Sequence, residues 1–128
     1  MDRNGLERIY RAYIACLNRQ DWDALGEFVA DDARHNGRPF GLTGYRAMLE
    51  NDFRTIPDLR FTIGLLAADP PLIAARLDFD CRPVGEFLGL PVNGKRVRFS
   101  ENVFYRFEGC KIVEVWSLLD RDAVERQV

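Results

Sequence analysis

The sequence predicts an α+β domain in which helices pack on one side of a strongly curved antiparallel sheet that encloses a pocket. Apolar residues recur at helical spacing up to about residue 54 and alternate with polar residues from Arg60 onward. The last third of the chain, Arg96 to Asp120, has the pattern of one long β-hairpin. Helices followed by a run of antiparallel strands are typical of the α+β class.

Three helices are expected. The first covers about Gly5 to Asn18, where Asn4 and Glu7 have the spacing of a capping box. The second is shorter and begins at Asp21 as its N-cap. The third covers about Gly44 to Arg54. Each predicted helix carries an apolar stripe that has to be buried against another element.

Strands are expected at Arg60–Leu66 and Leu72–Arg82, because apolar residues alternate there with polar ones. A polar, turn-rich segment, Asp31 to Thr43, is expected as a loop. The connector Pro83–Gly94 is rich in glycine and carries exposed apolar residues. We expect this connector to shield the mouth of a pocket.

The final hairpin is expected to turn at Glu108-Gly109, since glycine tolerates the positive φ of a tight turn. Pairing outward from this turn sets Arg106 opposite Lys111 and Ser100 opposite Ser117. Asn102 and Phe104 then share a face with Ser117. The opposite face carries Phe99, Glu101, Val103, Tyr105, Ile112, Glu114, Trp116 and Leu118. Both faces are largely apolar with a few polar groups, which favours a sheet wrapped around a pocket.

The composition indicates a single domain spanning residues 1–128. The net charge of −2 argues against a nucleic-acid surface, which needs a basic patch. No signal peptide or membrane span is expected, because the N-terminus is charged and no apolar run approaches about 18 residues. Cys16, Cys81 and Cys110 are interpreted as reduced core thiols, so we expect a cytoplasmic protein.

Several segments resemble one known group of proteins. They are His35-Asn36-Gly37, the stretch from Ile56 to Phe61, the stretch from Gly85 to Pro91, and the hairpin RFEGCKIVEVW followed by SLLD. The chain is similar to the cone-shaped nuclear transport factor 2-like fold, and more narrowly to the SnoaL-like polyketide cyclase and ester cyclase group. The resemblance implies a hollow cone, and homodimers that pair through the outer face of the sheet. This fold hosts both enzymes and binding proteins.

The resemblance also implies a catalytic Asp directly after the hairpin tryptophan, often with a His before it. This sequence departs from that pattern, because Val115 and Ser117 flank Trp116. Any chemistry therefore needs other residues. Asp120 matches the last Asp of the family pattern, although it can equally cap a short helix at Arg121–Arg126.

Three residues are the candidates for chemistry. His35 is the only histidine and thus the only side chain with an ordinary pKa near neutrality. Glu101 is flanked by apolar residues, so burial should raise its pKa toward that of a general base. Asn102 carries an amide that can donate to an enolate oxygen. The structural alternatives are a loop histidine bonded to backbone or nearby Asp, a Glu paired with arginine, and an Asn that satisfies backbone groups.

The substrate is expected to be a small apolar molecule with a carbonyl group, transformed by an aldol-type cyclisation or an isomerisation without a cofactor or a metal. Residues expected to contact it are Asn36, Phe40, Tyr45, Phe53, Phe104, Trp116, Ser117 and Asp120. Two alternatives stay open. One is a binding protein that lost the catalytic Asp. The other is an epoxide-hydrolase type of enzyme, in which Asp78, Asp80 or Glu101 activates water. Homodimers are expected, but no membrane or nucleic-acid partner.

Overall fold

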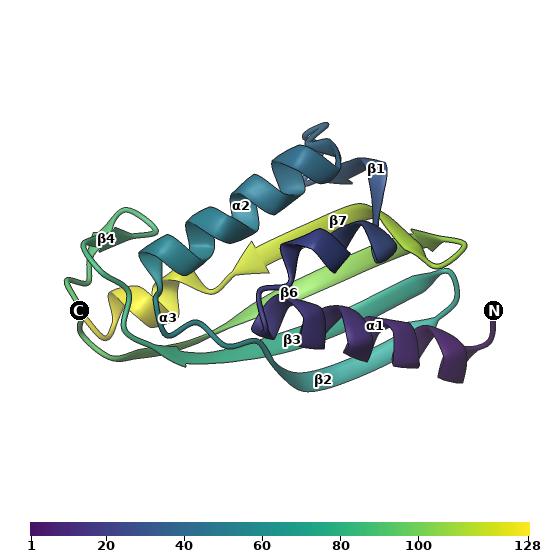
Figure 1. Ribbon diagram of the computed structural model, residues 1–128. Coiled ribbons are helices and arrows are strands. Elements are labelled where there is room, and N and C mark those ends of the chain that lie inside the picture. Colours follow the sequence, from purple (N-terminus) through teal and green to yellow (C-terminus); the bar gives the residue numbers. More distant parts are fainter.

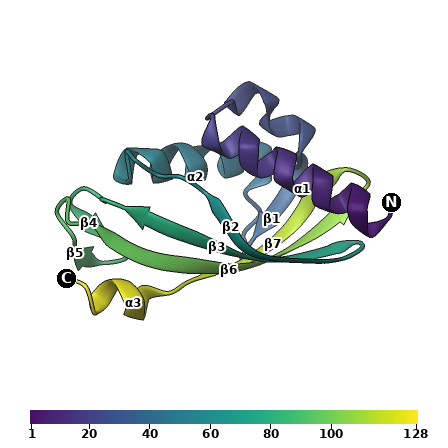
Figure 2. The same ribbon diagram turned by 90° about the horizontal axis from the view of Figure 1, so that it is seen from below.

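Helices and sheet form two layers in the computed structural model, which describes residues 1–128 (Figure 1). The helical elements are α1 (Arg3–Asn18), the 3₁₀ helix η1 (Trp22–Glu27), α2 (Gly41–Thr55) and α3 (Arg121–Glu125). Figure 2 shows α1, η1 and α2 on the same side of the sheet, while α3 lies on the other side near the C-terminus. The predicted α+β class with helices packed on one side of a curved sheet is confirmed.

The main sheet has five strands in the order β1-β7-β6-β3-β2. All neighbours pair antiparallel except β1 and β7, which run parallel. The strands are β1 (Val29–His35), β2 (Thr62–Asp69), β3 (Leu72–Cys81), β6 (Val97–Glu108) and β7 (Lys111–Leu119). Two short strands, β4 (Glu86–Phe87) and β5 (Leu90–Pro91), pair with each other in the connector that was predicted as a loop.

Strand β1 overlaps the first part of the segment from Asp31 to Thr43 that was predicted as a loop, so that prediction is wrong as far as His35. Its residues are mostly polar and it sits at the sheet edge, where only one neighbour is needed. The first helix also begins earlier than predicted. Asp2 caps it by accepting a hydrogen bond from the Gly5 backbone N–H at 2.7 Å, so Asn4 is not the N-cap.

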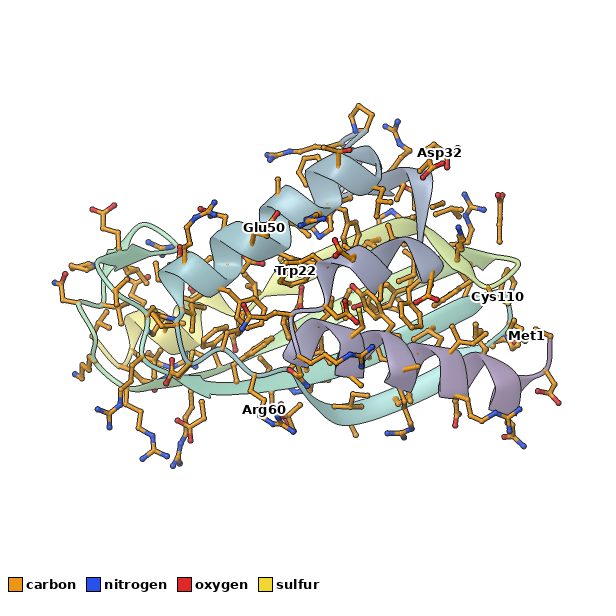
Figure 3. The ribbon with its side chains drawn as sticks, in the orientation of Figure 1. Met1, Trp22, Asp32, Glu50, Arg60 and Cys110 are labelled. Atoms are coloured by element: carbon orange, nitrogen blue, oxygen red, sulfur yellow. The ribbon has the colours of Figure 1, made fainter.

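The core fills the space between the helices and the concave face of the sheet (Figure 3). One half-buried pair of hydrogen bonds fixes the end of α1 against this layer. The Asn18 side chain donates to the Phe61 backbone oxygen at 2.9 Å and accepts from the Phe61 backbone N–H at 2.7 Å. The C-terminal end of α1 is therefore locked onto the segment that enters β2, which closes one side of the interior.

The register of the long hairpin differs from the prediction and decides which residues face inward. Glu108 pairs with Lys111, so Gly109 and Cys110 form the turn. A bulge then follows, because Phe107 pairs with Ile112 whereas Arg106 pairs with Glu114. The one extra residue, Val113, reverses the alternation of β7 relative to β6. Ser117 consequently shares the inner face with Glu101, which corrects the predicted pairing of Ser117 with Ser100.

The same bulge turns apolar side chains outward. Trp116 and Leu118 lie on the outer face of the sheet, next to Phe104 and Asn102 of β6. Cys110 is also exposed, at the tip of the hairpin (Figure 3), so its interpretation as a core thiol is wrong. Cys16 and Cys81 are buried free thiols, as expected.

Candidate active site

A cavity of about 170 Å³ lies between α1, α2 and the concave face of the sheet. Most of its lining is apolar. The polar groups on its wall are the side chains of Tyr13, His35, Tyr45, Asp52, Glu101, Tyr105 and Ser117. A concave space with a few polar groups on an apolar wall is the usual form of a small-molecule site.

Glu101 lies in the middle of β6 and faces the cavity. Burial raises the pKa of this carboxyl, and a hydrogen bond from the Ser117 hydroxyl to Oε2 opposes the rise. No protein group binds the other oxygen, Oε1. Because no buried polar atom lacks a partner in this structure, Oε1 must be reachable from the cavity. Glu101 therefore presents one oriented oxygen to a bound molecule.

Asp52 is a second carboxyl on the wall, contributed by α2. Burial raises its pKa to about 7, with a further contribution from the negative charge of Glu101. Two neighbouring carboxyls in an apolar site resist being ionised together, so they titrate as a coupled pair. The hydrogen bond from Ser117 favours the ionised form of Glu101. The pair thus combines Glu101, whose pKa is raised by burial and held back by the Ser117 hydroxyl, with Asp52, whose pKa is about 7.

His35 is the last residue of β1, and a tight turn follows it. The central residues of this turn are Asn36 and Gly37, whose φ angles are +49° and +79°. Positive φ at both central residues is the signature of a type I′ turn, for which Asn-Gly is the preferred pair. The imidazole stacks on Phe40 with ring centroids 5.7 Å apart, and it meets Tyr45 edge-on at 6.1 Å. Burial and the positive charge of Arg38 lower the pKa of His35, so the ring is neutral at pH 7.

The backbone around Ser117 is held by Asn36. The Asn36 side chain accepts from the Ser117 backbone N–H at 2.8 Å and donates to the Ser117 backbone oxygen at 3.1 Å. Asn36 is exposed and does not line the cavity. Its observed contact is with the β7 backbone, where it fixes the residue that binds Glu101, rather than with the interior where a substrate would bind.

Four buried tyrosines form two hydrogen-bonded pairs beside the carboxyls. The hydroxyls of Tyr13 and Tyr45 lie 2.6 Å apart, and Tyr10 donates to Tyr105 at 3.2 Å. Burial raises the pKa of each of these phenols, so they remain protonated donors. Of the four, only Tyr10 does not line the cavity.

Four of the predicted site residues come together on the cavity wall, namely His35, Tyr45, Glu101 and Ser117. No hydrogen bond joins His35 to either carboxyl. Glu101 forms no ion pair with an arginine, so the alternative considered for it fails, and His35 forms no ion pair with an Asp. A backbone hydrogen bond at His35, the other part of its alternative, is present.

Three predictions of pocket position are wrong, and all three arise from the hairpin. Asn102, Phe104 and Trp116 lie on the outer face. Even residues of β6 point away from the helices, and the bulge turns Trp116 outward with them. Asn102 accepts a hydrogen bond from Arg76 at 3.4 Å there. An amide on that face cannot reach an enolate in the cavity.

Three further predicted contacts lie outside the cavity. Phe40 stacks on the ring of His35 and does not line the cavity itself. Phe53 of α2 packs edge-on against Trp22 of η1, with ring centroids 5.8 Å apart. Asp120 caps α3 by accepting from the Ala123 backbone N–H at 3.1 Å, which is the structural alternative considered for it.

Asp52, Tyr13 and Tyr105 are cavity residues that were not predicted. The signal for Asp52 was present in the sequence. It lies seven residues after Tyr45 and three after Leu49, so it falls on the apolar stripe of its helix. An acidic side chain within an apolar stripe is buried together with that stripe, unless the stripe itself is exposed. Tyr13 similarly belongs to the stripe of the first helix.

No group of three or more His, Cys, Asp and Glu side chains is arranged to hold a metal ion. No helix of the structure is long and apolar enough to cross a membrane. The chemistry that the described side chains offer is proton transfer, with two carboxyls of raised pKa, a neutral imidazole and phenol donors around one apolar space.

The comparisons with known proteins agree with this architecture. A family model described as SnoaL-like polyketide cyclase matches residues 7–128. The solved structure of a SnoaL-like polyketide cyclase from Agrobacterium tumefaciens is 57% identical, with a TM-score of 0.95 over 99% of this chain and 98% of that one. TsrD from Streptomyces laurentii is 26% identical, with a TM-score of 0.85 over 99% and 96% of the two chains.

AclR from Streptomyces galilaeus shares the fold at 20% identity, with a TM-score of 0.78 over 96% of this chain and 94% of that one. No curated protein matches the sequence. The family match covers nearly the whole chain and, as the resemblance implied, places it in the nuclear transport factor 2-like superfamily. The chain belongs to the SnoaL-like polyketide cyclase family.

Proposed function

We propose that this protein is a cofactor-independent acid–base enzyme, a cyclase or isomerase that acts on a small apolar substrate with a carbonyl group. The observation that carries the proposal is the pair of carboxyls, Glu101 and Asp52, whose pKa values are raised by burial in an apolar cavity. Strongly perturbed carboxyls in a cleft are typical of catalytic groups. The family match and the 57% identical cyclase structure support the cyclase class.

The two carboxyls would divide the reaction between them. Ionised Glu101 removes the proton next to the carbonyl through Oε1, and the proton remains on that oxygen. Protonated Asp52 donates to the carbonyl oxygen as negative charge develops there. In a cyclisation the enol returns its O–H proton to Asp52 while its carbon attacks a second carbonyl of the substrate, whose oxygen takes the proton held by Glu101. In an isomerisation the enol is a conjugated dienol, which returns its O–H proton to Asp52 and takes the proton from Glu101 at the far carbon. Neutral His35 is a second proton acceptor on the same wall.

The two alternative functions, a binding protein and an epoxide-hydrolase type of enzyme, are supported by different observations. A binding protein remains compatible with Ser117 in the position where the resemblance implies the catalytic Asp. An epoxide-hydrolase type of enzyme would have to use Glu101 or Asp52. Asp78 and Asp80 lie on the outer face, where Asp80 pairs with Arg96 at 2.6 Å.

Proton abstraction can be tested before the natural substrate is identified. Small open-chain, monocyclic and bicyclic ketones are incubated in D₂O, and exchange of the hydrogens next to the carbonyl is followed by NMR. We expect the protein to accelerate exchange on at least one ketone, and Glu101→Gln to reduce that rate about 10²- to 10⁴-fold, the range for loss of a general base. Glu27→Gln, at an exposed position, is the matched control. Exchange that is equally fast in Glu101→Gln would remove Glu101 from the mechanism.

The rate of this exchange should depend on pH in a bell shape. It rises as Glu101 loses its proton and falls as pH passes about 7, because Asp52 then loses the proton it donates. In Asp52→Asn the amide cannot be deprotonated, so the fall on the alkaline side should disappear while the overall rate is lower. The measurement is the rate from pH 4.5 to 9 for both proteins. An unchanged alkaline limb in Asp52→Asn contradicts the assignment.

We also propose that a second copy of the chain covers the outer face of the sheet. Phe104, Trp116 and Leu118 are 56%, 43% and 72% exposed there. Trp116 is paired with Phe104 across neighbouring strands, so the apolar groups form one patch. Arginines and acids flank it on the same face, for example Arg76 and Asp78. A patch with both charge signs at its edge suits pairing with itself about a two-fold axis.

The oligomeric state checks this second proposal. Light scattering at high protein concentration should give the mass of a dimer, and Trp116→Arg should shift the protein to monomer without loss of folded signal in circular dichroism. Lys111→Arg, an exposed substitution on the same strand that keeps the charge, is the control. A wild-type protein that stays monomeric at high concentration excludes the dimer.

A further inference from the structure

We infer that the cavity binds a neutral molecule the size of a single ring, whose oxygen accepts a hydrogen bond from the Tyr13–Tyr45 pair. The inference rests on the proposed function for the location of the site, and it names the class of substrate. Three independent properties of the cavity lead to it. They are its volume, the charge of its lining and the number of hydroxyl hydrogens that the protein leaves without an acceptor.

The volume limits the size of the ligand. The cavity measures about 170 Å³. An apolar cavity of roughly 150 Å³ accommodates benzene. Pockets for drug-sized ligands measure about 300–1,000 Å³. The cavity therefore holds one six-membered ring with a small substituent, or an open chain of similar bulk, whereas three or four fused rings would have to extend out of its mouth.

The lining limits the charge of the ligand. It contains two carboxyls and no Lys or Arg side chain. An anionic ligand, such as a carboxylate or a phosphate ester, would lose its hydration and find no cation to pair with. Ionised Glu101 would in addition repel it. A neutral molecule avoids both costs, and its apolar part matches the phenylalanine and aliphatic side chains of the wall.

Counting hydrogens identifies the donors that can orient the ligand. Tyr105 accepts from Tyr10 at 3.2 Å and keeps its own O–H free on the cavity wall. The Tyr13–Tyr45 pair offers a second donor. Tyr13 and Tyr45 have two hydroxyl hydrogens, and the single bond between them at 2.6 Å uses one. Whichever residue donates, the other keeps an O–H with no protein acceptor. Both residues are almost completely buried, at 2% and 1% exposure, and both line the cavity. An unmatched donor in such a place is costly unless a ligand oxygen accepts from it.

A ketone of one ring has the features that these three properties demand, since it is neutral, compact and carries one acceptor oxygen. The same oxygen would hold the negative charge formed when a neighbouring proton is removed, so a tyrosine donor there would bind the enolate more strongly than the ketone. The pair would thus act as a specificity determinant and as a support for the proposed reaction.

Equilibrium binding tests this inference without any turnover. Dissociation constants are measured by protein-detected NMR titration for cyclohexanone, the three-ring ketone anthrone, cyclohexanecarboxylate and methylcyclohexane, at pH 8. We expect cyclohexanone to bind most tightly, the carboxylate at least tenfold more weakly, and anthrone also more weakly because it would extend out of the mouth. Anthrone or the carboxylate binding as tightly as cyclohexanone would overturn the inference.

Variants isolate the contribution of the tyrosine pair. The double substitution Tyr13→Phe with Tyr45→Phe removes both hydroxyls and keeps both rings. We expect it to weaken cyclohexanone binding about 2- to 10-fold, the value of one hydrogen bond, and to leave methylcyclohexane binding unchanged. Each single substitution leaves one free O–H, so it should weaken cyclohexanone less than the double one. Unchanged cyclohexanone binding in the double variant contradicts the assignment of the donor.

The outcomes separate this inference from the proposed function. Selective binding of cyclohexanone with no hydrogen exchange would leave the ligand class standing and reject the acid–base enzyme. Exchange that depends on Glu101, together with equal binding of all ring sizes, would keep the enzyme and reject the ligand class.

Discussion

The chemistry of this fold depends on one carboxylate placed among apolar side chains. Glu101 occupies an inward position of β6, where burial disfavours its ionised form and raises its pKa. An arginine partner would have lowered the pKa and consumed both oxygens. The protein instead supplies a single hydroxyl from Ser117. That is enough to orient the group and too little to restore its ordinary pKa, so the Glu101 carboxylate is a stronger base than an exposed glutamate.

The bulge at Val113 makes this contact possible, because without it Ser117 would point outward. The family resemblance implies an acid directly after the hairpin tryptophan. In this chain the residue at that position donates a hydrogen bond to an acid on the neighbouring strand instead. Asn36 holds the Ser117 backbone in place from β1. Although Ser117 stands where the resemblance implies an Asp, the pocket still contains two carboxyls, because Glu101 and Asp52 both lie on its wall.

The sequence predicted the layers of the fold and that Glu101 and Asn102 point to opposite faces, because alternation along β6 is regular from Phe99 to Phe107. It did not decide which of these faces lines the pocket. It could not predict the faces of β7. No glycine or proline marks the bulge, and one extra residue reverses every later side chain. Asp52 was recoverable from its place in an apolar stripe. Its raised pKa was not, because it depends on Glu101, which is 49 positions away in the chain.

Direct titration of the two carboxyls tests the central claim most simply. Carbon-13 NMR of protein labelled at Glu and Asp side chains should show Glu101 titrating above its ordinary value and Asp52 near pH 7. Replacing Ser117 by Ala should raise the pKa of Glu101 further, because the hydroxyl that favours its ionised form is gone. Ordinary values of about 4 for both carboxyls would contradict the claim that burial prepares them for proton transfer.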